Sequence, residues 1–183
     1  MPAIDLIQRH TEVIHLDGDR DYRLETLGAK PAYHIPDDAQ AEASMRALLL
    51  EIDRTAALGA DTLRLNGRDI PVRARGNGVI WFDFEALCDG PRSKVDYVEL
   101  SRSFHTLLLS GIPRFDTESE DAARRLVELI DELYDRKVNV IVSAAAPANE
   151  LYHGNRLTED FVRTASRLHE FQSEDYLASA HRP

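Results

Sequence analysis

Two polar residues stand where a side chain could contact a bound anion. Arg92 lies in a Gly-Pro turn just before an expected helix, and a guanidinium there can hold a phosphate or a carboxylate through two hydrogen bonds. Ser143 lies at the end of a β-branched run, where parallel sheets place contacts to ligands. Each residue also has a structural alternative. Arg92 could pair with Asp89 or Asp96, and Ser143 could bond only to the backbone of its loop.

Two further arginines, Arg163 and Arg167, are four residues apart and therefore share one face of an expected helix. Glu159, Asp160 and Glu170 stand at helical spacing from them. The spacing alone therefore favours ion pairs along the helix surface.

The sequence lacks the residues with which P-loop proteins hold a triphosphate. A P-loop needs Gly-Lys-[Ser/Thr], so that backbone amides and a lysine surround the phosphates, and none of Lys30, Lys94 and Lys137 follows a glycine. Asp131-Glu132 is the only acidic pair in the order that positions Mg²⁺ and water, but it lies inside an amphipathic helical pattern. We expect this pair to form a solvated face, and we expect this chain alone to bind neither ATP nor Mg²⁺.

The other chemically reactive residues indicate neither a catalytic centre nor a metal site. Cys88 is the only cysteine, which excludes an internal disulfide and a cysteine-based metal cluster, and we expect it to be a small buried residue. The seven histidines show no His-x-x-x-His or similar spacing. Trp81, Phe82 and Phe84 could form an exposed patch for a partner, although we expect two of the three in the core. We predict no catalytic and no metal-ligating residue.

The composition is that of a folded soluble protein with an acidic surface. Of the 183 residues, 43% are hydrophobic and 30% are charged, and the net charge of −10 disfavours non-specific binding to nucleic acid or anionic membranes. No apolar run approaches the roughly 20 residues that span a bilayer, and the first residues lack the pattern of a signal peptide. We expect a cytoplasmic protein that binds no nucleic acid and reaches membranes only through partners.

The stretch from Phe104 to Ala146 organises the expected fold. Residues 105–113 form a short apolar run closed by Gly and Pro, which is typical of a strand buried on both faces. Apolar residues between 126 and 133 recur at helical spacing, and residues 138–144 form a second β-branched run. A strand, a helix and a strand within about 40 residues predict a right-handed βαβ unit.

The flanking segments predict helices and a small antiparallel sheet. The extended pieces at 62–65, 70–74 and 79–84 are separated by Asn-Gly pairs, which predicts an antiparallel β meander. Before the meander we expect a short helix at 4–7, extended pieces at 11–16 and 22–27, and an irregular segment at 29–36. A helix capped by Asp37 or Asp38 follows and is ended by Leu58-Gly59-Ala60. After the meander we expect a helix begun at Ser93 or Asp96, a helical turn at 147–152, and a final helix at 158–177 interrupted near 172–173.

Long multi-residue stretches carry a family resemblance over essentially the whole chain. They are Trp81-Phe-Asp-Phe84, Leu87-Cys-Asp-Gly-Pro-Arg-Ser93, Asp96-Tyr97, Phe104-His-Thr-Leu-Leu-Leu-Ser-Gly-Ile-Pro113, Ile130-Asp-Glu-Leu-Tyr134, Val142-Ser143 and Ser166 to Leu177, with Pro2-Ala-Ile4 and Asp21-Tyr-Arg-Leu24 near the start. These stretches resemble the C-terminal half of the ZapE family of AAA+ P-loop ATPases, which is linked to cell division.

The resemblance implies the C-terminal part of an AAA+ type ATPase. Residues 1–60 are then the tail of the nucleotide-binding core and a helical segment, and residues 61–183 are an α/β region with the β meander. The complete protein is expected to use ATP and Mg²⁺, to form a homo-oligomer and to contact cell-division proteins.

The resemblance also gives the candidate residues a role. It makes Arg92, Ser143, Arg163 and Arg167 candidate contacts to a nucleotide or to a neighbouring subunit. It implies that this chain needs an N-terminal ATPase half and is inactive without it. The alternative is an independent protein-interaction module without nucleotide chemistry.

Overall fold

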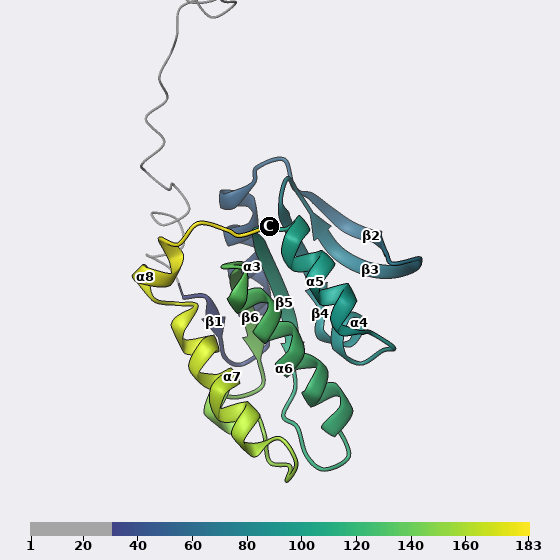
Figure 1. Cartoon of the computed structure of the whole chain (residues 1–183). Coiled ribbons are helices and arrows are strands. Elements are labelled where there is room, and N and C mark those ends of the chain that lie inside the picture. Colours follow the sequence, from purple (N-terminus) through teal and green to yellow (C-terminus); the bar gives the residue numbers. More distant parts are fainter. Residues whose placement is uncertain (1–30) are drawn as a thin grey trace, which may run out of the picture.

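A computed structural model describes residues 31–183, which share one six-stranded sheet in the order β1-β6-β5-β4-β3-β2 (Figure 1). The strands are β1 Tyr33–His34, β2 Ala57–Leu65, β3 Arg68–Arg75, β4 Val79–Asp83, β5 Thr106–Ile112 and β6 Asn139–Ala144. β4, β5, β6 and β1 are parallel, whereas β2, β3 and β4 run antiparallel. The expected α/β fold, its βαβ unit and its meander are confirmed. β4 belongs to both parts, because it pairs with β3 on one side and with β5 on the other.

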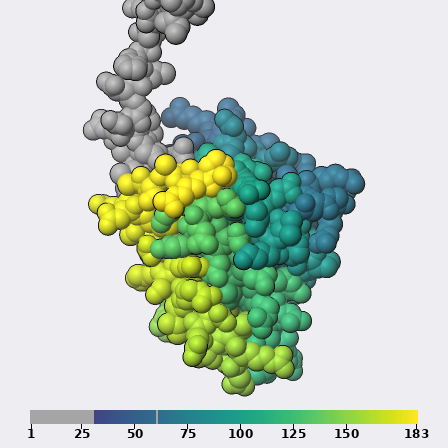
Figure 2. All heavy atoms as spheres, viewed as in Figure 1, coloured from purple at the N-terminus to yellow at the C-terminus, as the bar shows by residue number. Residues whose placement is uncertain are grey.

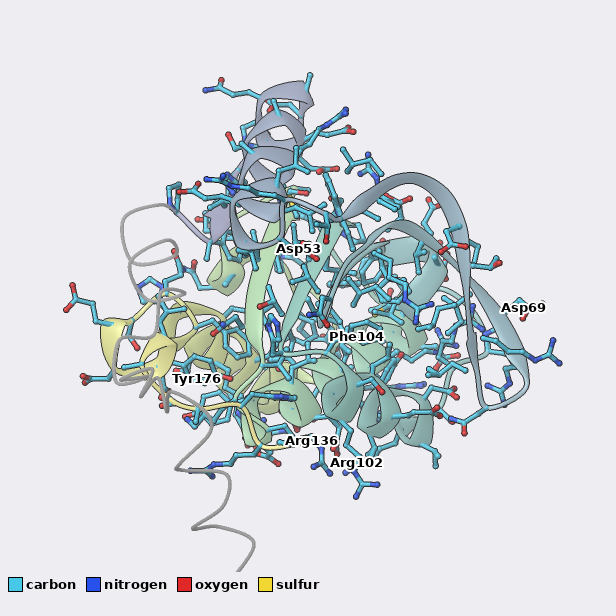
Figure 3. All side chains as sticks on the ribbon, turned by 90° about the horizontal axis from the view of Figure 1, so that it is seen from above. Asp53, Asp69, Arg102, Phe104, Arg136 and Tyr176 are labelled. Atoms are coloured by element: carbon cyan, nitrogen blue, oxygen red, sulfur yellow. The ribbon has the colours of Figure 1, made fainter. Side chains whose placement is uncertain are left out.

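Helices cover both faces of this sheet. They are α3 Ala39–Ile52, α4 Phe84–Cys88, α5 Lys94–Ser103, α6 Glu120–Asp135, the 3₁₀ turn η1 Ala148–Glu150, α7 Thr158–Glu170 and α8 Glu174–Leu177. Seen from above, α3 lies on one side of the sheet and the α5, α6 and α7 layer on the other (Figure 3). None of the described helices is long and apolar enough to cross a membrane.

The alternation of side chains along the central strands builds two cores. In β4, Trp81 points to the α3 side, where it packs with Met45, and Phe82 points to the side of α5 and α6. Because successive residues of a strand face opposite sides, an apolar run such as 106–109 supplies both cores at once. This explains why β5 and β6 are buried along nearly their whole length.

Two sequence expectations about element boundaries were wrong. α3 ends at Ile52, where Asp53 leaves the helical conformation and bonds Thr55, and residues 58–60 belong to β2 instead. Gly59, at φ +129°, lies at a register shift in β2 that an isolated glycine pattern does not distinguish from a helix end. The segment expected to be irregular contains β1, a two-residue strand.

The other expected elements of the described region agree with the structure. Asp38 caps α3, and Ser93 and Asp96 form a capping box at the start of α5. The final helix is divided into α7 and α8 near the expected position. The elements expected at 4–7, 11–16 and 22–27 lie outside the described residues.

Candidate functional site

Ser143 lies at the carboxyl end of β6 and joins three segments. It is 1% exposed and stands opposite His34 in the β1–β6 register. Its hydroxyl donates to Asp37 Oδ1 over 2.5 Å and accepts from the Gly111 amide over 3.3 Å. Gly111 has φ +80° at an irregularity in β5, a conformation that turns its N–H toward Ser143 and that L side chains rarely adopt. Ser143 therefore fastens the loop between β1 and α3 to the end of β5.

The chain's own carboxylates occupy the junction between β1 and α3. A helix that follows a parallel strand presents free amides, and such a helix start is a common phosphate site. Here Asp38 Oδ1 accepts hydrogen bonds from the amides of Gln40 and Ala41, each over 2.9 Å. Asp37 takes the Ser143 hydroxyl. Two negative side chains at this junction would repel an incoming phosphate.

His34 adds no positive charge to this junction. The residue is 9% exposed, and its Nε2 has no hydrogen-bond partner among the residues that the structure describes. Burial lowers the pKa of His34, which favours the neutral ring at physiological pH. Sequence reasoning did not single out His34 or the Asp37 contact, because strand β1 is too short to show a periodic pattern.

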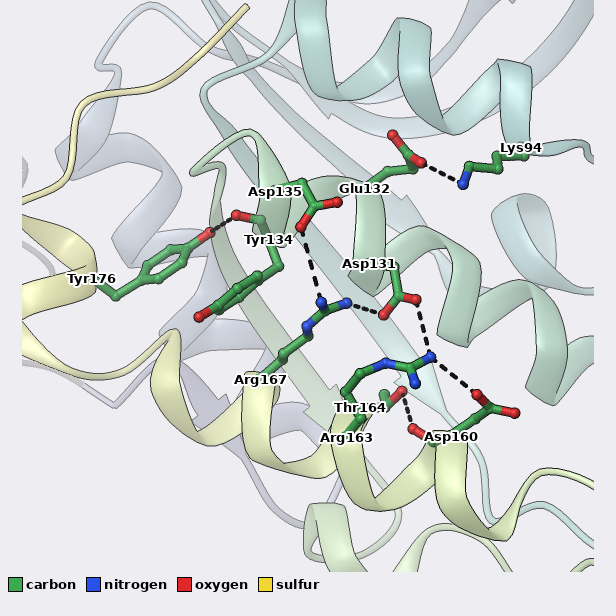
Figure 4. Close-up of polar contacts among 10 residues, drawn as sticks. All are labelled: Lys94, Asp131, Glu132, Tyr134, Asp135, Asp160, Arg163, Thr164, Arg167 and Tyr176. Atoms are coloured by element: carbon green, nitrogen blue, oxygen red, sulfur yellow. Dashed lines mark hydrogen bonds and ion pairs between the residues drawn. The ribbon is translucent and has the colours of Figure 1, made fainter.

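Arg163 and Arg167 meet on one carboxylate of the neighbouring helix (Figure 4). Arg163 Nη2 lies 3.2 Å from Asp131 Oδ2 and 3.0 Å from Asp160 Oδ1, and Arg167 contacts the other oxygen of Asp131. The Arg167 guanidinium also lies 4.6 Å from the centroid of the Tyr134 ring. The pairing of Arg163 with Asp160 follows the helical spacing, whereas the contact to Asp131 joins α7 to α6.

The acidic pair 131–132 is therefore not the solvated face that the sequence suggested. Asp131 binds two arginines of α7, and Glu132, which is 9% exposed, pairs with Lys94 Nζ over 3.1 Å. Both carboxylates hold neighbouring helices to α6. The geometry gives both carboxylates structural partners.

Arg92 binds a backbone carbonyl of α4, the short helix that precedes it. Its Nε and Nη2 donate to the carbonyl of Ala86 over 3.1 and 3.0 Å, and neither Asp89 nor Asp96 receives it. Asp96 is instead bound by Asn66 and Arg68. Of the four candidate residues, the structure brings together only Arg163 and Arg167. Arg92 contacts α4, and Ser143 contacts the loop before α3.

The remaining candidates are part of the core. Trp81, Phe82 and Phe84 are all buried, so they form no exposed patch. Burial raises the pKa of the Cys88 thiol to about 12, so the residue is an unreactive thiol. Within residues 31–183, no group of three His, Cys, Asp or Glu side chains is placed to hold a metal ion.

A parallel sheet with helices on both faces and an antiparallel extension defines a three-layer α/β domain of mixed topology. The chain belongs to the AFG1-like ATPase family, whose model matches residues 1–180. This finding confirms the resemblance to an AAA+ ATPase of the ZapE type.

Individual relatives give the same result. The cell division protein ZapE of Escherichia coli K12 is 39% identical over 181 residues, which are 99% of this chain and 48% of ZapE. An uncharacterized protein of Schizosaccharomyces pombe is 33% identical over 156 residues, which are 83% of this chain and 34% of that protein. Lactation elevated protein 1 homolog B of Danio rerio is 27% identical over 219 aligned positions, covering 100% of this chain and 43% of that protein.

The chain spans less than half the length of each of these relatives, and the segment of ZapE that it matches is the C-terminal half. No solved structure matches the chain significantly.

Replacing Ser143 by alanine is expected to lower the free energy of unfolding by about 1–2 kcal/mol, because the Gly111 amide and the Asp37 carboxylate both lose a partner. Urea unfolding followed by circular dichroism measures the change. Ser166→Ala, at an exposed serine of α7, is the control and should stay within about 0.5 kcal/mol. Equal stability of the two variants would show that Ser143 does not fasten the loop.

Proposed function

We propose that this chain is the part of an AFG1-like ATPase that supports the nucleotide machinery through packing, and not the part that binds ATP. The observation that carries the proposal is the junction of β1 and α3, where Asp37 and Asp38 occupy the helix start that could otherwise hold phosphate. The complete protein would use ATP and Mg²⁺ through residues outside this sheet.

In the complete protein, the candidate residues would act at contacts and not in chemistry. Arg163 is the best placed of them, because its side chain is 46% exposed while it remains anchored on Asp131. A nucleotide or a neighbouring subunit could therefore approach its free guanidinium edge. Arg92, Ser143 and Arg167 are held by their own neighbours and would support such a contact indirectly.

The wider expectations form part of the same proposal. Residues 1–60 would be the tail of the nucleotide-binding core and a helical segment, and residues 61–183 would be the C-terminal α/β region with the β meander. The complete protein would form a homo-oligomer in the cytoplasm and contact cell-division proteins, as the name of its E. coli relative suggests. It would bind no nucleic acid and would reach membranes only through partners.

A reconstitution experiment tests the supporting role. ATP turnover is measured for this chain, for the separately purified P-loop half of the E. coli relative, and for the two together. We expect no turnover from this chain and a clear gain when the halves are mixed. Turnover by this chain alone would contradict the proposal, and so would an absence of any gain when the two halves are shown to bind each other.

One observation favours the alternative of an independent interaction module. A groove of about 1060 Å³ runs between the β1–η1 region and α7, and it is lined in part by Ile35 and Val162, which are 47% and 68% exposed. Contiguous exposed apolar surface often marks a docking surface, and this groove would bring the two side chains together on one. If the chain binds a protein partner but never the P-loop half, this alternative replaces the first proposal.

A further inference from the structure

Three arginines gather at the end of the molecule where the parallel strands begin. Arg102 lies in the last turn of α5, Arg136 follows the last residue of α6, and Arg182 belongs to the tail that crosses both helix ends. Figure 3 looks down on this end and shows Arg102 and Arg136 near the same edge, and Figure 2 shows the C-terminal residues lying over it. We call Arg102, Arg136 and Arg182 the basic edge.

The C-terminal tail, residues 178–183, holds the basic edge together through two hydrogen bonds to backbone carbonyls. The His181 ring donates from Nε2 to the carbonyl of Ser101 over 2.7 Å, at the end of α5. One residue later, the amide of Arg182 donates to the carbonyl of Arg136 over 2.8 Å, at the end of α6. These bonds bring one arginine from each helix end and one from the tail into the same neighbourhood.

Among the described residues, the guanidinium groups of these three arginines have no partner. In the described part of the chain, no carboxylate pairs with Arg102, Arg136 or Arg182, and the Nε atom of Arg136 is buried without a hydrogen bond. Arginines near helix C-termini commonly serve the exposed carbonyls there. Here the tail already satisfies the Ser101 and Arg136 carbonyls, so the guanidinium donors other than the buried Arg136 Nε remain available.

We infer that the basic edge binds an acidic peptide segment, a run of Asp and Glu side chains belonging to another protein. Each guanidinium can hold one carboxylate through two parallel hydrogen bonds, and a flexible peptide can reach arginines that come from three separate segments. These arginines line neither the groove beside α7 nor the smaller hollow that Arg46 and Trp81 help to line.

Charge distinguishes an acidic peptide from larger polyanions. The chain as a whole carries a net charge of −10. A nucleic acid or an anionic membrane would extend over this acidic surface and be repelled. A short peptide stays within about one Debye length, roughly 8–10 Å at moderate salt, of the three arginines.

Fluorescence anisotropy with a labelled hexaglutamate peptide and the complete 183-residue chain tests the inference. The variant R102Q/R136Q/R182Q should bind the peptide at least about tenfold more weakly than the wild type at low salt. R46Q/R54Q/R124Q removes the same charge from three other exposed arginines and should change affinity less than about threefold. Melting curves of both variants establish that each is folded.

Each remaining outcome decides against the inference. If the two triple variants weaken peptide binding equally, the loss of affinity comes from net charge and not from the basic edge. If the wild type does not bind the peptide at low salt, the inferred site does not exist. Single-stranded DNA and anionic phospholipid vesicles are tested alongside. Tighter binding of either one, lost in R102Q/R136Q/R182Q, would show that the basic edge serves a phosphate polymer and not an acidic peptide.

Discussion

Truncating Phe115 to alanine is expected to lower the free energy of unfolding by about 3–5 kcal/mol. Phe115 is 1% exposed and its ring lies 5.6 Å from Phe84 and 5.5 Å from Phe161, measured between centroids. It therefore joins α4 to α7 across the loop that follows β5. Removing the ring leaves a cavity that neither helix can fill without moving, which adds to the lost burial.

Trp81 provides the signal for this measurement, because it is the only tryptophan and is 2% exposed in the folded chain. Urea unfolding followed by its fluorescence gives the stability of each variant. Val162→Ala, which shortens a 68% exposed apolar residue of α7, is the control and should change stability by less than about 0.5 kcal/mol. A loss below about 1 kcal/mol for Phe115→Ala would mean that the aromatic contacts do not join these helices.

Replacing Asp96 by alanine is expected to cost about 2–4 kcal/mol. Its carboxylate is 1% exposed, accepts from the Ser93 amide over 2.8 Å in the capping box of α5, and binds Asn66 and Arg68 at the tip of the β2–β3 hairpin. The variant removes the cap and leaves the hairpin groups without a partner. The half-exposed side chain of Arg68 limits the loss of stability, because water can solvate its guanidinium once the carboxylate is gone.

The Asp96 contribution should depend on pH. Burial alone would raise the pKa of Asp96, but the hydrogen bonds from Asn66 and Ser93 and the charge of Arg68 outweigh burial and lower it. The stability it supplies is then fully present above the unfolded pKa of about 3.9 and is lost as pH falls through the folded pKa. The difference between wild type and Asp96→Asn should therefore shrink from pH 7 to pH 2–3. A constant difference would contradict an ionised Asp96.

Local patterns were sufficient for most of the fold. The βαβ unit, the meander and the helix caps follow from residues close in sequence, so the apolar runs and the Asn-Gly pairs predicted them. β1 was missed because two residues carry no periodicity, and it forms only by pairing with β6, more than 100 positions later. The end of α3 was misplaced because a glycine in a strand irregularity resembles a helix terminus.

In the candidate site, too, the sequence predicted local features and missed contacts between distant elements. Ser143 was placed correctly at the end of a parallel strand, but its partner Asp37 is 106 positions away in sequence. Helical spacing predicted Asp160 as a partner of Arg163 and could not reveal Asp131, which lies on another helix. Contacts between distant elements depend on how the helices pack, and sequence spacing does not encode that directly.

Titration of a fluorescent ATP analogue into the purified chain, with and without Mg²⁺, tests the central claim most directly. Micromolar binding corresponds to roughly 8 kcal/mol. Arg163 is partly exposed but already paired with Asp131 and Asp160, so it offers at most one further charge-assisted contact of about 1.5–3 kcal/mol. The carboxylates of Asp37 and Asp38 oppose phosphate at the helix start that follows β1. We therefore expect no saturation up to millimolar analogue. Saturable, Mg²⁺-dependent binding in the low micromolar range would contradict the account.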